Sequence, residues 1–220
     1  MSRKRSFIIL CILCLFVAGL VLFIHLYESQ SKQKEQSNPY RLEAGEIALL
    51  QEGDLIFRKG FGIISDCIAR TTQVCYNISH VGVLCKDAQH RWMVIHTVSN
   101  TLVNVDGMQI DELAHFVRQS YPNTIVVLRY RHGSDSSRAA IVRQAYHYLD
   151  RQIPFDDTFD MQDTSEFFCT EFIRKLFLDV YKKDLYELAS DHPYASLRFG
   201  PFWNADNFST VFAHQEKQTR

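Results

Sequence analysis

Near its N-terminus the chain carries an apolar run that is long enough to cross a bilayer. Residues 7–26 contain no Asp, Glu, Lys or Arg, and the only basic group among them is the weakly basic His25. About 20 apolar residues in a helix span the hydrocarbon core of a membrane. The small residues Ala18 and Gly19 lie inside the run rather than after it. This favours a retained transmembrane anchor at 7–26 over a cleaved signal peptide.

The charges around the run predict its orientation. Residues 3–5 are Arg-Lys-Arg, whereas residues 27–45 carry charges of both signs. Because cytoplasmic flanks are enriched in Lys and Arg, we expect residues 1–6 to form a cytoplasmic tail. The chain would then be a single-pass membrane protein whose folded domain lies outside the cytoplasm, in a periplasm or at the cell surface.

Composition beyond the run indicates one folded domain. Residues 28–38 are polar and lack apolar periodicity, so we expect a flexible tether over 27–45, a folded domain over 46–212 and a tail over 213–220. A net charge of −1 with 46% hydrophobic residues suits a globular domain and gives no basic surface for nucleic acid. An exported location permits disulfides, and Cys67 with Cys75 is the pair to be tested.

The hydrophobic patterns after residue 46 predict an α+β fold, in which a small antiparallel sheet packs with helices. Expected strands are 53–57, 77–86, 91–99, 102–105 and 124–131, and residues 87–89 would join the second and third as a hairpin. Expected helices are 63–72, 110–117, 136–149 and one that carries Cys169. An irregular aromatic tail would then run to Phe212.

The last of these helices places a thiol near its start. Thr164 or Ser165 is a suitable N-cap, and an apolar stripe runs from Cys169 to Val180 with Glu171 turned away. A cysteine on such a face is most often a buried core residue. It is also suited to be a nucleophile, because a helix N-terminus lowers the pKa of a thiol. That effect leaves the thiol only partly ionised at neutral pH, so a histidine partner is needed.

Two histidines lie on the predicted hairpin. If residues 87–89 form its loop, the ladder sets His80 directly opposite His96 on one face. A loop one residue longer would place them on opposite faces. Gly82, on the face of His80, is expected to leave room for a helix. Each histidine alone is most often a core or surface residue, but the pair with Cys169 is the arrangement that thiol catalysis needs.

Two separated motifs resemble those of a known family. Residues 53–57 (GDLIF) and 79–82 (SHVG) form the first, and residues 155–159 (FDDTF) and 168–171 (FCTE) form the second. Both resemble motifs of the permuted papain-like amidases, the YiiX-like relatives of NlpC-type cell-wall peptidases and of lecithin:retinol acyltransferase. In that family the histidine strand precedes the cysteine helix, as it does here. The resemblance implies a circularly permuted papain-like, NlpC-type domain.

Carried over residue by residue, the resemblance makes Cys169 the nucleophile, His80 the general base and His96 the third, orienting residue. His96 stands where YiiX-like members often have a glutamate. Since an imidazole titrates nearer neutrality than a carboxylate, we expect the acid limb of the pH–rate profile to lie higher than with a glutamate. Glu171 matches the family motif, and its direction away from Cys169 favours a structural role.

These observations predict a membrane-anchored cysteine hydrolase or acyl-transfer enzyme without cofactor or metal. It would cleave an amide, in a cell-wall peptide or a lipid, through a thioester on Cys169. One alternative is a lipid ester or amide acyltransferase, or a thioesterase, of the lecithin:retinol acyltransferase type. Another is a zinc site, because one cysteine and two histidines are also zinc ligands. A third is a non-catalytic lipid- or peptide-binding module.

Overall fold

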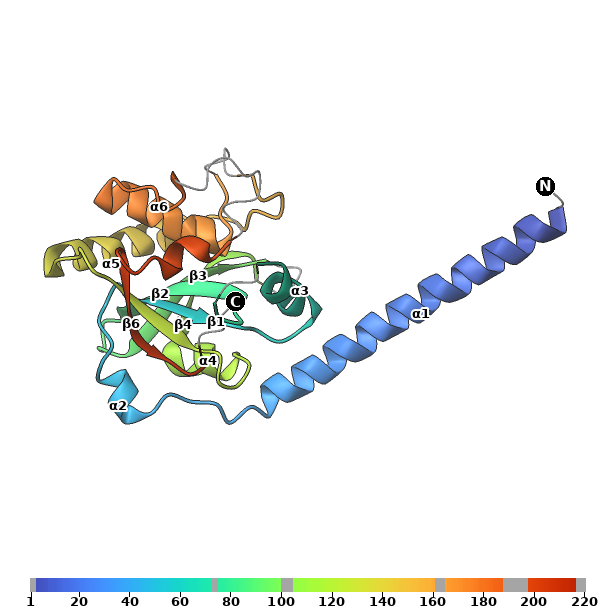
Figure 1. Ribbon diagram of the computed structural model, residues 1–220, viewed down its shortest axis with the longest axis horizontal. Coiled ribbons are helices and arrows are strands. Elements are labelled where there is room, and N and C mark those ends of the chain that lie inside the picture. Colours follow the sequence, from blue (N-terminus) through green and yellow to red (C-terminus); the bar gives the residue numbers. More distant parts are fainter. Residues whose placement is uncertain (1–2, 73–74, 100–104, 161–164, 188–197, 217–220) are drawn as a thin grey trace.

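The computed structural model describes residues 3–72, 75–99, 105–160, 165–187 and 198–216. In this part of the chain an antiparallel sheet of six strands has the order β4-β3-β2-β1-β5-β6 (Figure 1). The strands are β1 (Leu55–Arg58), β2 (His80–Lys86), β3 (Trp92–Val98), β4 (Gly107–Glu112), β5 (Val126–Tyr130) and β6 (Phe208–Ala213). The predicted α+β class is confirmed.

Helices cover both faces of this sheet (Figure 1). The helices of the domain are α2 (Ala44–Ile47), α3 (Ile63–Thr72), α4 (Leu113–Arg118), α5 (Asp135–Asp150), α6 (Cys169–Tyr181) and the 3₁₀ helix η3 (Gly200–Trp203). Successive strand residues point to opposite faces. Val81 and Val83 of β2 therefore join the core cluster that includes α5 and α6, whereas Leu84 joins the cluster that includes α4.

The helix α1 (Arg3–Gln36) projects from the domain, with its N-terminus at the far end (Figure 1). By length and composition Ser6–Gln36 qualifies as a single membrane span. Residues 27–36, predicted as part of a flexible tether, continue this helix. Their Gln, Lys and Glu residues are good helix formers, and a helix that the apolar run has already nucleated is readily extended through them.

Two strands lie where the sequence predicted other structure. Residues 110–112 end β4 instead of beginning a helix, because pairing with β3 (Ile95↔Ile110) overrides their local preference. The predicted irregular tail contains β6, which covers the edge of β5. Of the predicted strand at 102–105, residues 102–104 lie outside the described residues, and Val105 is not in a strand.

The hairpin between β2 and β3 turns one residue later than predicted. The backbone N–H of Asp87 donates to the carbonyl of Arg91 (3.1 Å), and the three-residue loop between them ends at His90 in the left-handed region (φ 60). Lys86 therefore pairs with Trp92. Moving the loop by one residue shifts the pairing by two, so each side chain keeps its predicted face.

Candidate active site

The helix that carries the thiol, α6, begins at Cys169 itself. The predicted N-cap is wrong, since Ser165 lies four residues earlier in the chain and Thr164 lies outside the described residues. The segment before the helix is extended instead, and the backbone N–H of Phe167 donates to the carbonyl of Pro154 (3.0 Å). The thiol therefore lies in the first turn, whose backbone N–H groups have no partners within the helix.

Burial raises the pKa of the Cys169 thiol to about 11, because the thiolate would lose its hydration. Backbone N–H groups of Val81, Thr170 and Cys169 itself oppose this shift, and so does the charge of Arg58, but they do not overcome it. The lowering expected from the helix N-terminus is thus outweighed. At neutral pH the thiol is protonated and needs a base.

His80 and His96 share one face of the sheet, as predicted, but they are not directly opposed. In the shifted register His96 lies beside Gly82, two residues from His80 along β2. The two rings meet edge to face, with His80 Nε2 and His96 Nδ1 2.9 Å apart. Gly82 makes room for this contact and not for a helix, because a Cβ atom there would lie 2.6 Å from Val94 Cγ1 and 3.1 Å from His96 Cβ.

Asp111 of β4 extends this contact, and the sequence reasoning missed it. Its Oδ2 atom lies 3.0 Å from His96 Nε2. Burial alone would raise the pKa of Asp111, but the hydrogen bond with His96, together with the charges of His96, His115 and Arg58, leaves the pKa below its ordinary value. A signal was present in residues 107–112, where Met108 and Ile110 alternate with polar residues as in a half-buried strand.

The hydrogen bonds assign each nitrogen in what we call the two-histidine relay, Asp111–His96–His80. Burial lowers the pKa of both imidazoles below the ordinary value, so both rings are neutral at pH 7. A carboxylate only accepts, so His96 Nε2 carries the proton and His96 Nδ1 accepts from the Nε2–H of His80. His80 Nδ1 is then left with a lone pair that can accept a proton.

Arg58 is a buried cation beside these rings that the sequence reasoning also missed. It stands opposite His80 in the β1–β2 register. Its Nη1 donates to the carbonyl of Phe116 (2.9 Å), and its guanidinium lies 4.1 Å from the centre of that ring. Burial lowers the pKa of Arg58 to about 10, so it keeps its charge. After desolvation, this charge is the largest cause that lowers the pKa of His80.

The fold brings Cys169 to the end of β2 that bears His80. Val81, the next residue after His80, presents its backbone N–H to the sulfur. Thr97, the next residue after His96, donates to the carbonyl of Phe167 (3.2 Å) and so ties β3 to the segment before α6. Within the described residues, the hydrogen bond of the His80 ring is to His96 rather than to the thiol.

Glu171, predicted to turn away from the apolar face, is nonetheless fully buried. In the described part of the chain neither carboxylate oxygen has a hydrogen-bond partner, and Lys175 Nζ lies 3.9 Å away. Burial raises the pKa of Glu171 to about 7; the charge of Lys175 opposes this shift without overcoming it, and the negative charge of Asp156 adds a smaller increase. Glu171 is therefore a buried carboxyl group two residues from Cys169, poorly compensated in its charged form.

The described residues contain no group of three or more His, Cys, Asp or Glu side chains arranged to hold a metal ion. Cys169, His80 and His96 are thus not arranged as a zinc-ligand set. The cysteines are free thiols, and these include Cys67 and Cys75, the pair considered for a disulfide.

Comparison with known proteins identifies the family. A family model described as "Permuted papain-like amidase enzyme, YaeF/YiiX, C92 family" matches residues 49–214. The chain belongs to the permuted papain-like amidase family. Among solved structures it is similar to "Crystal structure of metalloprotein yiiX from Escherichia coli O157:H7, DUF1105", with a TM-score of 0.53 and 18% identity over 74% of this chain and 97% of that one. No curated protein matches the chain.

Membership of the permuted papain-like amidase family makes the protein a cysteine-type hydrolase at the level of the family. The permuted order corresponds to β2, with His80, preceding α6, with Cys169. At 18% identity the likeness to yiiX shows the fold alone, and the word metalloprotein in its title describes that protein.

Proposed function

We propose that this protein is a membrane-anchored cysteine amidase whose catalytic domain lies outside the cytoplasm. Cys169 is the nucleophile, His80 is the general base, and His96 orients His80. Asp111 joins the predicted set, because it fixes the tautomer of His96. The family supports the thiol chemistry, and the apolar helix α1 supports the anchor.

The observation that carries this proposal is the two-histidine relay. Its hydrogen bonds of 3.0 Å and 2.9 Å leave His80 Nδ1 as the acceptor at the end of β2, where Cys169 also lies. His80 and His96 pack against Phe116 on the α4 face of the sheet, whereas Val81 and Thr97 face α6, so we propose that His80 reaches the thiol around the end of β2. A thiol with a raised pKa and a neutral imidazole form a pair in which the proton moves during the attack. We therefore assign His80 the role of general base rather than that of the cation in a preformed thiolate–imidazolium pair.

With an amide substrate, the reaction consists of acylation of Cys169 followed by hydrolysis of the thioester. His80 Nδ1 takes the thiol proton while Cys169 Sγ bonds to the carbonyl carbon, and backbone N–H groups at the start of α6 stabilise the oxyanion. The tetrahedral intermediate then breaks its C–N bond, and His80 gives its proton to the leaving amine. Water attacks the thioester with His80 as base, which releases the acid and restores the thiol. An alcohol or amine in place of water would make the same site an acyltransferase.

Two substrate classes fit this chemistry, an amide of a cell-wall peptide and an amide or ester of a lipid. The anchor keeps the domain near both. Acyl transfer between lipids is therefore the second candidate function, and it uses the same residues.

Labelling with an acylating activity-based probe tests the proposal. We expect covalent modification of Cys169 in the wild type, none in Cys169→Ala, and a rate lower by about 10²–10⁴-fold in His80→Ala, since general-base catalysis contributes that factor. Cys67→Ala is the matched control, because it removes an exposed thiol outside the relay. Labelling that survived His80→Ala unchanged would refute the catalytic pair.

The same assay separates the other two predicted classes. A zinc enzyme would lose activity to a chelator, whereas a cysteine enzyme loses it to iodoacetamide. A non-catalytic binding module would retain substrate without forming any acyl adduct on Cys169.

A further inference from the structure

The helix α1 contacts the domain where its apolar run ends. Glu28 Oε1 accepts a hydrogen bond from the backbone N–H of Ile63, the first residue of α3, at 2.8 Å. The hydroxyl of Tyr27 bonds to Asp66 of the same helix. The apolar run ends at Leu26, and a helix rises about 1.5 Å per residue, so this contact lies about 3 Å along the axis from the end of the run.

The contact continues beyond Glu28. Tyr27, Glu28, Ser31 and Glu35 are half-buried, whereas the residues between them are exposed, as expected for one helical face against the domain. The side-chain amide of Asn38 then donates to two backbone carbonyls at the end of α4, each at 2.7 Å. The domain is therefore held against the membrane-proximal end of α1, not at the end of a free tether.

The helix held there, α3, leaves apolar side chains uncovered. None of its ten residues is fully buried; Ile64 is 39% exposed, and Cys67 is exposed one turn later. Beside it Tyr121, 45% exposed, contacts the ring of Phe61 (5.5 Å between centroids) and lies under Lys59 Nζ (4.9 Å). We call these residues the α3 surface. It lies on the side of the domain from which α1 projects (Figure 1).

The α3 surface adjoins the candidate active site. Ser79 Oγ accepts from the backbone N–H of Gly60 (3.0 Å) and bonds to Ser65 Oγ of α3 (3.2 Å). Ser79 precedes His80, and Gly60 follows Arg58 by two residues. One end of α3 is thus bonded to the membrane helix, and its side is bonded to the strand ends that carry the base and its neighbouring cation.

We propose that the α3 surface rests in the interfacial layer of the bilayer that α1 crosses, and that Cys169 acts on an amide or ester of an amphiphile drawn from that bilayer. The bilayer is the occupant because Glu28 and Tyr27 hold α3 at the level where the apolar run ends. Apolar side chains beside a tyrosine and a lysine are also the composition that membrane interfaces favour. The substrate half of the inference rests on the proposed function, whereas the surface half does not.

Depth measurement on the full chain tests the surface half. An environment-sensitive fluorophore on Ile64→Cys, in a background that lacks the other accessible thiols, is compared with one on Leu49→Cys. Leu49 is also apolar and exposed (53%) but follows α2. In vesicles of phosphatidylethanolamine and phosphatidylglycerol we expect blue-shifted emission and quenching by a lipid-confined quencher at position 64 only. Water-like emission at both positions would refute the placement of the α3 surface in the bilayer interface.

A pair of substrates tests the substrate half. We expect Ile64→Asp to lower turnover of a long-chain N-acyl amide embedded in vesicles by about tenfold, the effect of removing one interfacial isoleucine. Hydrolysis of a water-soluble short-chain thioester should change less than about twofold, because α3 does not supply the reacting groups. Leu49→Asp should change neither. Equal effects of Ile64→Asp on the two substrates, or none on either, would overturn the substrate assignment.

The outcomes distinguish this inference from the proposed function. If Cys169 is acylated by neither substrate, the thiol chemistry is wrong, and the depth measurement still decides the surface. If the short-chain thioester is turned over but the fluorophore at position 64 emits as in water, the proposed amidase function is supported and the placement of the α3 surface in the bilayer is refuted.

Discussion

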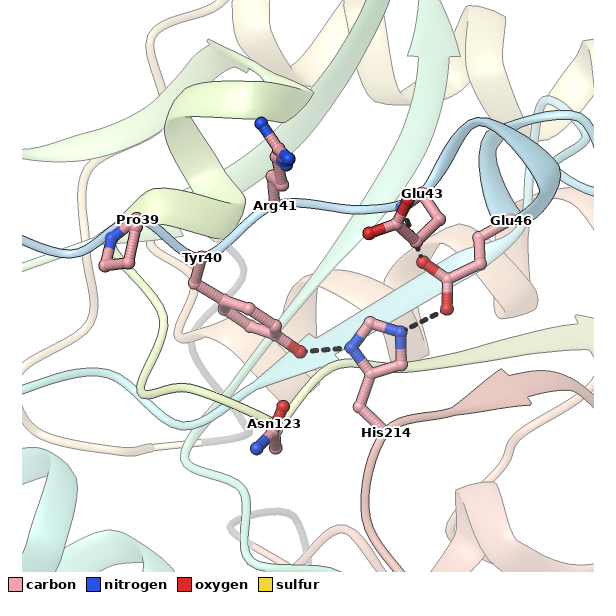
Figure 2. Close-up of a pocket in the computed structure, with 7 residues that line it drawn as sticks. All are labelled: Pro39, Tyr40, Arg41, Glu43, Glu46, Asn123 and His214. Carbon is pink, nitrogen blue, oxygen red and sulfur yellow. Dashed lines mark hydrogen bonds and ion pairs between the residues drawn. The ribbon is translucent and has the colours of Figure 1, made fainter.

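The two-histidine relay has a counterpart on another part of the domain, built from similar groups. There Glu46 of α2 contacts Nε2 of His214, and Nδ1 of His214 contacts the hydroxyl of Tyr40 (Figure 2). We call this set the tyrosine relay. Each relay joins a carboxylate, an imidazole and a third group, and the tyrosine relay lines a hollow of about 450 Å³. By position in a hollow alone, it would be the better candidate for a site.

The relays differ in the group at their end. Burial raises the pKa of Tyr40 to about 12, so its hydroxyl stays protonated and donates to His214. That relay is closed, and it fastens the segment between α1 and α2 to the residue after β6. The two-histidine relay ends instead on the lone pair of His80 Nδ1, one residue before Val81, whose backbone N–H contacts the thiol of Cys169. A chain of hydrogen-bonded groups becomes a catalytic candidate through its open acceptor and the nucleophile beside it.

Removing one imidazole from each relay, the terminal His80 and the central His214, gives the largest expected contrast. His80→Ala should lower the rate of Cys169 acylation by about 10²–10⁴-fold, because the thiol loses its base. His214→Ala should change that rate less than about twofold, since it has no contact with the reacting groups. Single-turnover acylation with a soluble thioester measures both. Comparable losses in the two variants would show that the tyrosine relay also serves catalysis.

Glu171 differs from the carboxylates of both relays, because no histidine among the described residues is bonded to its carboxyl group. Its folded pKa of about 7 lies above its unfolded value of about 4.5, so the folded state binds the proton more tightly. Its contribution destabilises the fold as pH rises from about 4.5 to about 7, by on the order of 3 kcal/mol in total. Glu171→Gln should therefore raise the free energy of unfolding at about pH 8 and leave it nearly unchanged near pH 4.5.

Denaturant unfolding of the full chain in detergent checks this expectation. Glu187→Gln, which alters an exposed carboxyl group, serves as the control. A Glu171→Gln variant that lost stability at both pH values would mean that the carboxylate is stabilised by its surroundings in the fold.

At the far end of the two-histidine relay, Asp111→Asn should lower the acylation rate by about tenfold. The effect is smaller than that of His80→Ala because Asp111 fixes a tautomer two groups away from the sulfur. Glu112→Gln is the matched control: the neighbouring residue carries an exposed carboxylate that pairs with Arg91 instead of a histidine. If both variants kept the wild-type rate, the relay would end functionally at His96.

The residues that carry the family motifs could be found from the sequence, and their supporting neighbours could not. His80 and His96 were predicted on one face because side-chain direction depends only on the parity of the pairing, and the one-residue shift of the hairpin loop preserves parity. The prediction that the two histidines pair directly was wrong, because the loop extends to His90 in a left-handed conformation that the local composition does not predict.

Arg58 and Asp111 were missed for different reasons. Asp111 lay in a segment predicted as a helix, and only its pairing with β3 makes that segment a strand. Arg58 ends an apolar strand, and nothing in its local sequence says that its charge is buried against Phe116. The start of α6 was misplaced because pairing of Phe167 with Pro154 keeps the preceding residues extended. These contacts join residues that are far apart in the sequence, so the hydrophobic periodicity of a single segment cannot predict them.

The acid limb of the pH–rate profile provides the next test. His80 must be neutral to accept the thiol proton, and its pKa lies well below the ordinary value, chiefly through burial and then through Arg58. Activity should therefore persist below about pH 6.5. Arg58→Met should raise the pKa of His80 and move the limb upward by about one pH unit, whereas Arg58→Lys, which keeps a charge, should move it less.

His96→Glu should also move the limb upward, because a carboxylate next to His80 favours its protonated form. This is the reverse of the expectation from the sequence, which considered the titration of His96 itself and did not foresee that burial lowers its pKa. A limb that moved downward in His96→Glu would mean that His96, not His80, sets the protonation state on which activity depends.

The smallest expected effect belongs to the end of the tyrosine relay. Tyr40→Phe removes the hydroxyl that contacts His214 and accepts a hydrogen bond from the backbone N–H of Ile125 (3.4 Å). Losing a hydrogen bond of this kind costs about 1 kcal/mol of stability. The free energy of unfolding should fall by about that amount, while the rate of Cys169 acylation stays at the wild-type value. Because the hydroxyl of Tyr40 closes the relay, its removal should weaken the attachment of the segment after α1 to His214 and leave the reaction at Cys169 unchanged. A variant of normal stability but reduced acylation would contradict the division between a structural and a catalytic relay.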